Sequence, residues 1–168
     1  MGTLHSLFQF KAWANRALFA RLQEVDADTH AEALHAMVRM LNHIYVVDRI
    51  FRAHLLGEPH GYTGTNTEDT PTLDELQFNV AETDAWYLDH AQQLSEGQLG
   101  DSLAFTFTDG DAGCMSREEM LLHVITHGSY HRGNVGQMLK GIGMAPPRDL
   151  YTKFLHEVEP QRRSTAAW

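Results

Sequence analysis

The alternation of apolar and polar positions predicts two long helices in the first third of the chain. Apolar residues recur at helical spacing over residues 3–23. A second apolar stripe follows a cap at Asp28 or Thr29 and ends at Gly57, a residue type that commonly terminates helices. The break between the two stripes is short, so we expect antiparallel neighbours. The polar, glycine-containing run 57–71 is expected to be a loop.

Two further helices are marked by capping-box patterns, in which Ser or Thr precedes Glu by three residues. One pattern opens a helix at Thr72 that extends to about Leu94, and the other opens a helix at Ser116 that extends to about Lys140. Between them, the alternating stretch LAFTFT and the turn-forming DGDAG predict a small β-hairpin. This hairpin would lead directly into the last long helix.

Four long amphipathic helices indicate an all-α protein built as a four-helix bundle. Residues 148–159 favour a short final helix, and the tail from about residue 160 is expected to be frayed. The chain has no internal repeat and no interdomain linker, so residues 1–168 are interpreted as a single domain.

The charge balance disfavours two classes of partner. The chain has 13 Lys and Arg against 22 Asp and Glu, a formal net charge of −9. Binding to nucleic acids or to anionic membranes needs a basic face, so neither is expected. No stretch approaches the ~18 apolar residues of a membrane helix. The single cysteine, Cys114, is interpreted as a small packing residue; it rules out an internal disulfide and favours the cytoplasm.

The stretch HVITHGSYHRGN places His123, His127 and His131 four residues apart on the predicted fourth helix. Imidazoles one turn apart can converge on one metal ion, but three in a row span ~12 Å of helix axis. The useful unit is therefore one adjacent pair, completed by a ligand from another helix. Gly128 stands where the HExxH motif of metalloproteases has its glutamate.

Spacing leaves the third ligand open among His43, His54 and His5. Each of these histidines could also be an ordinary surface residue, or a boundary residue bonded to a backbone carbonyl. For the adjacent pair, the alternative to a metal site is a polar pocket that holds water. Two adjacent imidazoles beside core positions would nevertheless leave ring nitrogens unsatisfied, and a metal ion satisfies both.

Three segments together resemble the DinB family of metalloenzymes (DinB/YfiT-like proteins). They are FQFKAWANRALF, LNHIYVVDRIF and LLHVITHGSYHRGNVGQML, in this order over nearly the whole chain. The resemblance implies a bundle in up-down-down-up order and one divalent metal ion held by His43, His127 and His131. The ligand type favours zinc or nickel. His123 is then left as a residue near the site without an assigned role.

The chain departs from the family pattern at Asn134, where glutamine is common, so a contact made by the longer side chain is expected to be missed or bridged by water. Arg132 is interpreted as a charge partner or an interface residue, and Gly133 as a point of close helix approach. A homodimer is expected because family members often dimerise. Phe10 and Trp13, together with Phe8, cannot all face one core stripe.

Three neutral histidines leave a coordination position open, which is typical of catalytic sites. The resemblance favours a metal-dependent transferase that activates a low-molecular-weight thiol toward a small-molecule substrate. The alternatives are a metal-dependent hydrolase and a non-catalytic metal-binding stress-response module. No carboxylate is supported as a general base, and Asp48 is expected to be a surface aspartate.

Overall fold

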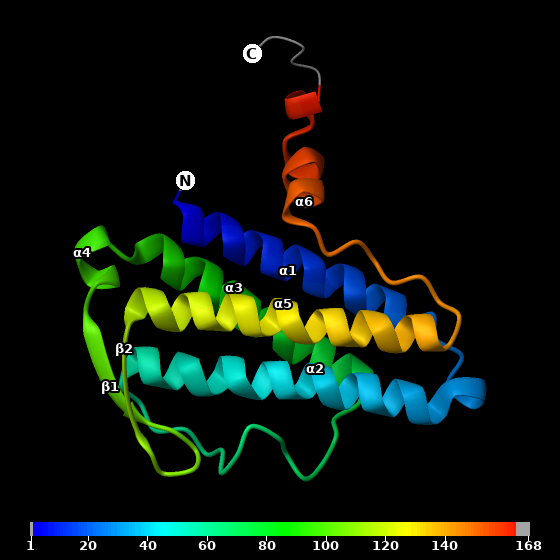
Figure 1. The fold of residues 1–168 in the computed structure, drawn as a ribbon, viewed down its shortest axis with the longest axis horizontal. Helices are drawn as coiled ribbons and strands as arrows, with labels where there is room; N and C mark the ends of the chain where they lie inside the picture. The colour runs from blue at the N-terminus through cyan, green and yellow to red at the C-terminus, as the bar shows by residue number, and fades with distance from the viewer. Residues whose placement is uncertain (1, 164–168) are drawn as a thin grey trace.

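A computed structural model describes residues 2–163 and is mostly helical, with one small antiparallel sheet (Figure 1). This confirms the all-α class and the hairpin before the last long helix. No helix among the described residues is long and apolar enough to cross a membrane. The elements are α1 (Thr3–Leu22), α2 (Ala27–Leu56), α3 (Leu73–Gln93), α4 (Glu96–Leu99), β1 (Ser102–Thr106), β2 (Ala112–Ser116), α5 (Arg117–Gly141), α6 (Tyr151–Val158) and the 3₁₀ helix η1 (Pro160–Arg163).

The helix boundaries follow the capping residues. Thr72 and Ser116 each make the expected capping box, at α3 and α5. Helix α2 ends at Gly57, whose φ of 68° is the left-handed conformation that glycine adopts without strain. The predicted start of α2 is wrong: the cap is Asp26, whose side chain accepts a hydrogen bond from the backbone N–H of Asp28. The four-residue helix α4 was not predicted, because it is too short to leave an apolar period.

Figure 1 shows α1 and α5 running in one direction and α2 and α3 in the opposite direction. Helix α1 packs against α3 and α5, and α2 packs against the same two helices. The run 57–71 is a loop without helix or strand, as expected. Strand β1 pairs with β2 from Ser102 opposite Ser116 to Thr106 opposite Ala112, and β2 continues directly into α5.

Helix α6 projects from the side of α1 (Figure 1) and covers aromatic side chains that were expected to be exposed. Phe8 and Phe10 are buried, and Trp13 is half-buried. Phe154 of α6 packs on Phe10 and Trp13, with ring centroids 5.9 Å from each. Phe8 and Phe10 are therefore not exposed aromatic residues of the kind that marks an interface, and the homodimer stays a prediction.

The beginning of the predicted tail is helical. Residues 160–163 form η1, where a frayed tail was predicted, and the rest of that tail lies outside the described residues.

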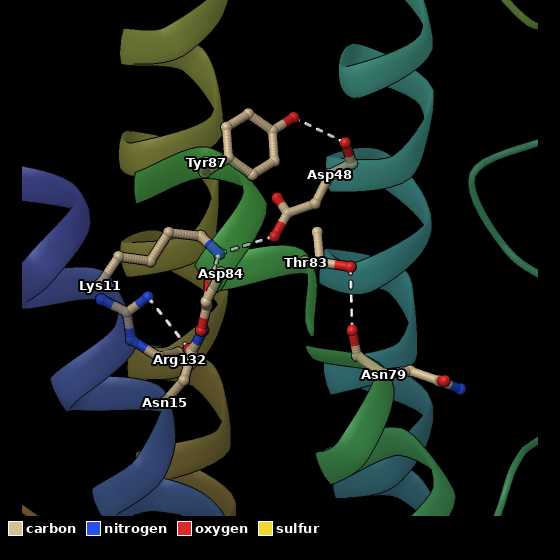
Figure 2. Close-up of polar contacts among 8 residues, drawn as sticks. All are labelled: Lys11, Asn15, Asp48, Asn79, Thr83, Asp84, Tyr87 and Arg132. Atoms are coloured by element: carbon tan, nitrogen blue, oxygen red, sulfur yellow. Dashed lines mark hydrogen bonds and ion pairs between the residues drawn. The ribbon is translucent and has the colours of Figure 1, made fainter. Parts of the chain in front are cut away.

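Three charged side chains meet in the middle of the helices (Figure 2). Nζ of Lys11, on α1, lies 2.7 Å from Oδ2 of Asp48 on α2 and 2.7 Å from Oδ1 of Asp84 on α3. All three residues are buried, so the expectation that Asp48 is a surface aspartate is wrong. Burial raises the pKa of Asp48 to about 6 against the opposing effect of Lys11. Burial alone would lower the pKa of Lys11, but the two carboxylates outweigh it and raise that pKa.

Neutral and charged groups around this cluster extend it to the remaining long helix. Asn15 donates to Oδ2 of Asp84 at 2.8 Å, and Arg132 of α5 reaches the side-chain oxygen of Asn15 at 3.5 Å. Arg132 is buried and forms an ion pair with Asp149 at 2.7 Å, which confirms its prediction as a charge partner. Tyr87 donates to the backbone carbonyl of Asp48. The network therefore joins α1, α2, α3 and α5.

We predict that Lys11→Met lowers the free energy of unfolding by about 3–5 kcal/mol, because it leaves two buried carboxylates without their counter-ion. Urea unfolding followed by circular dichroism measures this change.

Lys153→Met is the matched control. Lys153 pairs with Glu157 at 3.3 Å, but both side chains are exposed, so a loss of at most ~1 kcal/mol is expected. Equal losses in the two variants would show that the buried cluster has no special role in stability.

Candidate metal centre

Three histidines from two facing helices meet beside the ion cluster. His43 lies on α2, and His127 and His131 lie one turn apart on α5. One ring nitrogen from each residue lies within 4.8 Å of those from the other two, close enough for all three to hold one metal ion. Nε2 of His43 and Nε2 of His127 are 3.1 Å apart. These are the three residues that the family resemblance named as ligands.

Gly128, next to His127, lies where α5 faces Lys11 of α1 and Ile44 of α2. A Cβ atom at Gly128 would lie 3.2 Å from Nη1 of Arg132, 3.4 Å from Cε of Lys11 and 3.7 Å from Cγ2 of Ile44. A Cβ would be tight only against the arginine and in ordinary contact with the other two, so Gly128 marks the position at which α5 faces Lys11 and the residue that follows His43. A Cβ atom at Gly133, which was expected to be a point of close helix approach, would meet nothing within 4 Å, so that prediction is wrong.

The second ring nitrogen of each histidine has a different environment. Nδ1 of His43 lies 2.9 Å from the carbonyl oxygen of Thr65, so its N–H donates to that oxygen and leaves Nε2 with a free lone pair. The side-chain amide of Asn134 lies 3.4 Å from Nδ1 of His131, so the shorter side chain still reaches a ring of the cluster. Nδ1 of His127 is buried without a hydrogen-bond partner among residues 2–163.

The surroundings of His127 and His131 disfavour the protonated form of their rings. Burial lowers the pKa of His127 to about 3, helped by the neighbouring charges of His131 and His43. Burial, and then His43, also lowers the pKa of His131. Neutral imidazole is the form that binds metal ions, so these two rings need not lose a proton at neutral pH. The grouping of one ring nitrogen from each histidine, the unpartnered Nδ1 of His127 and the lowered pKa values together fit a divalent cation.

The structure separates the other candidate histidines from this cluster. The His123 ring is tilted against Phe51, with ring centroids 4.5 Å apart, and stacks on His127 at 5.4 Å, and burial lowers its pKa. It is not among the grouped ligand atoms. His54 packs against Phe105 near the hairpin, and His5 lies near the start of α1. Cys114 is exposed on β2, so its interpretation as a packing residue is wrong.

A cavity of about 390 Å³ opens over two of the three histidines. No carboxylate is among the described residues that line it, which are Ala36, Arg39, Met40, His43, Asn66 and His131. Sequence reasoning missed Arg39, Asn66 and the Thr65 carbonyl, because no motif marks them. The cavity leaves space beside the cluster for a fourth ligand, which is what a catalytic site requires.

Comparisons with known proteins match one family over almost the whole chain. The sequence model described as the DinB family matches residues 1–163. A relative described as "Protein DinB", from Bacillus subtilis (strain 168), is 23% identical over 171 residues, which cover 93% of this chain and 95% of that protein.

We predict that the purified protein holds about one divalent ion per chain, and that changing His43, His127 or His131 singly to Ala removes most of it. Each change removes one of three ligands from a site that a metal binds through all of them. Elemental analysis by mass spectrometry measures the metal-to-protein ratio.

His123→Ala is the control, since its ring lies on the same helix but outside the cluster. It should retain most of the metal. A site emptied by His123→Ala but not by His131→Ala would mean that the metal uses the other adjacent pair.

Proposed function

Because the chain belongs to the DinB family, we propose that it is a metal-dependent enzyme whose His43, His127 and His131 hold one divalent ion, zinc or nickel. The observation that carries the proposal is the grouping of three ring nitrogens beside an open cavity. A closed structural site would have four protein ligands and no such space.

The reaction we propose is transfer of a low-molecular-weight thiol to an electrophilic small molecule. When bound, a divalent ion with three neutral ligands supplies positive charge that favours a thiolate as its fourth ligand, although a free thiol has a pKa of about 8.5. The sulfur would then form a bond to an electrophilic carbon as the bond from that carbon to its leaving group breaks and the electron pair departs with that group. The proton lost by the thiol would pass to solvent or to the leaving group.

The residues of the chain favour transfer over metal-dependent hydrolysis. Activation of a water molecule commonly uses a carboxylate or histidine base next to the metal. No described carboxylate lines the cavity, and Asp48 is held in the buried pair with Lys11, so it is no candidate for this base. A thiolate needs no base at the transfer step. Hydrolysis remains the second candidate, and a non-catalytic metal-binding stress-response module the third.

The same resemblance supports the wider description of the protein. We propose that α1, α2, α3 and α5 form the up-down-down-up four-helix bundle of the family, within a single domain. The helix directions in Figure 1 support this order. We further propose that the protein is a homodimer and that it acts in the cytoplasm. The single free cysteine is consistent with a reducing compartment.

The test is to incubate metal-loaded protein with glutathione, bacillithiol or mycothiol and a panel of electrophiles. We predict thiol-dependent turnover that is lost on chelation and in His127→Ala. Mass spectrometry of the products identifies the new carbon–sulfur bond.

Thiol-independent cleavage of esters or amides at the same site would replace transfer with hydrolysis. No turnover in either screen, with no response of the cobalt-substituted protein to thiols, would favour the non-catalytic module.

A further inference from the structure

Arg39 is a cation at the cavity without a carboxylate partner. Its guanidinium donates from Nη1 to Oγ1 of Thr70 at 3.0 Å, and it makes longer contacts of 3.5 Å to the carbonyl oxygens of Glu68 and Thr67. Within residues 2–163 it forms no ion pair. The buried Arg132, in contrast, is paired with Asp149. The charge of Arg39 is therefore available to a ligand.

The position of Arg39 relates it to the metal centre. Arg39 precedes His43 by four residues on α2, so their Cα atoms are ~6 Å apart along the helix axis and on nearly the same face. Both residues line the cavity, together with His131 and Asn66. A ligand that reaches the histidine cluster through this cavity passes Arg39.

The guanidinium is also held in place. The loop 57–71 is fastened to α2 at three successive points: Thr70 accepts from Arg39, Thr67 accepts from Asn42 at 2.6 Å, and the Thr65 carbonyl accepts from His43. No hydrogen bond joins Nε of Arg39 to the described part of the chain. A fixed planar group with free donors is suited to a carboxylate, which it can bind through two parallel hydrogen bonds.

We infer that the cavity selects a small thiol that carries a carboxylate, with the sulfur at the three histidines and the carboxylate on Arg39. This assignment rests on the proposed function, since it places a thiol at the metal centre. Arg39, His43 and His131 line one cavity, so a single small molecule that carries a thiol and a carboxylate on a short carbon chain is the simplest ligand to contact them all. The net charge of −9 repels anions in general, so recognition of one requires a local unpaired cation such as Arg39.

The experiment compares two thiols of equal size on cobalt-substituted protein. 3-Mercaptopropionate carries the carboxylate, and 3-mercaptopropionamide replaces it with a neutral amide. Binding is followed by the thiolate-to-cobalt absorption band, which does not depend on turnover. We expect the wild-type protein to bind the carboxylate compound at least ~10-fold more tightly, the effect of one charge-assisted hydrogen-bonded pair.

Arg39→Met should remove this preference and leave the affinity for the amide within about twofold, with the cobalt content unchanged. Arg49→Met is the matched control, because Arg49 lies on the same helix but places its guanidinium 5.9 Å from the centre of the Tyr45 ring, outside this cavity. It should retain the preference of the wild-type protein.

Equal affinity of the wild-type protein for the two thiols would overturn the role of Arg39 and leave the proposed thiol site standing. Loss of affinity for both thiols alike in Arg39→Met would also overturn it, because a carboxylate contact affects only one. Absence of the absorption band with either thiol would overturn the proposed function and this inference together.

Discussion

The structure depends on one buried lysine held between two aspartates on different helices. Lys11, Asp48 and Asp84 have almost no exposure to solvent, and burial of unpaired charges costs several kcal/mol each. The cost is offset only when α1, α2 and α3 bring all three groups within hydrogen-bond distance (Figure 2). A shift of any one helix leaves a charge without its partner, so the cluster selects one arrangement of the helices over sliding alternatives.

The same arrangement of helices determines where His43 and His127 lie relative to each other. Gly128 of α5 lies against the aliphatic part of Lys11 and against Ile44, the residue that follows His43. His127 lies next to this glycine and reaches His43, and the loop that is bonded to α2 holds the His43 ring through Thr65. Packing brings the three imidazoles together, with Nε2 of His43 3.1 Å from Nε2 of His127, and leaves Nδ1 of His127 without a hydrogen-bond partner among the described residues. A bound cation explains why such a cluster is useful.

Local sequence signals predicted the helices and the hairpin. The third metal ligand and the buried charges depend on contacts between residues distant in sequence. Capping boxes at Thr72 and Ser116 and the glycine at residue 57 marked helix ends because those interactions span only a few residues. Spacing alone did not choose His43 over His54 or His5, because that choice depends on how α2 faces α5; the family resemblance made it. The burial of Asp48 was missed for the same reason, since its partner Lys11 lies 37 residues away.

X-ray absorption at the metal edge tests the central claim most directly, because it counts ligands without requiring turnover. For zinc-loaded protein the account predicts three imidazole nitrogens at roughly 2.0–2.1 Å with one further light atom, and replacement of that atom by sulfur at roughly 2.3 Å when a thiol is added. A spectrum with one or two imidazoles, or a first shell unchanged by saturating thiol, would contradict the account.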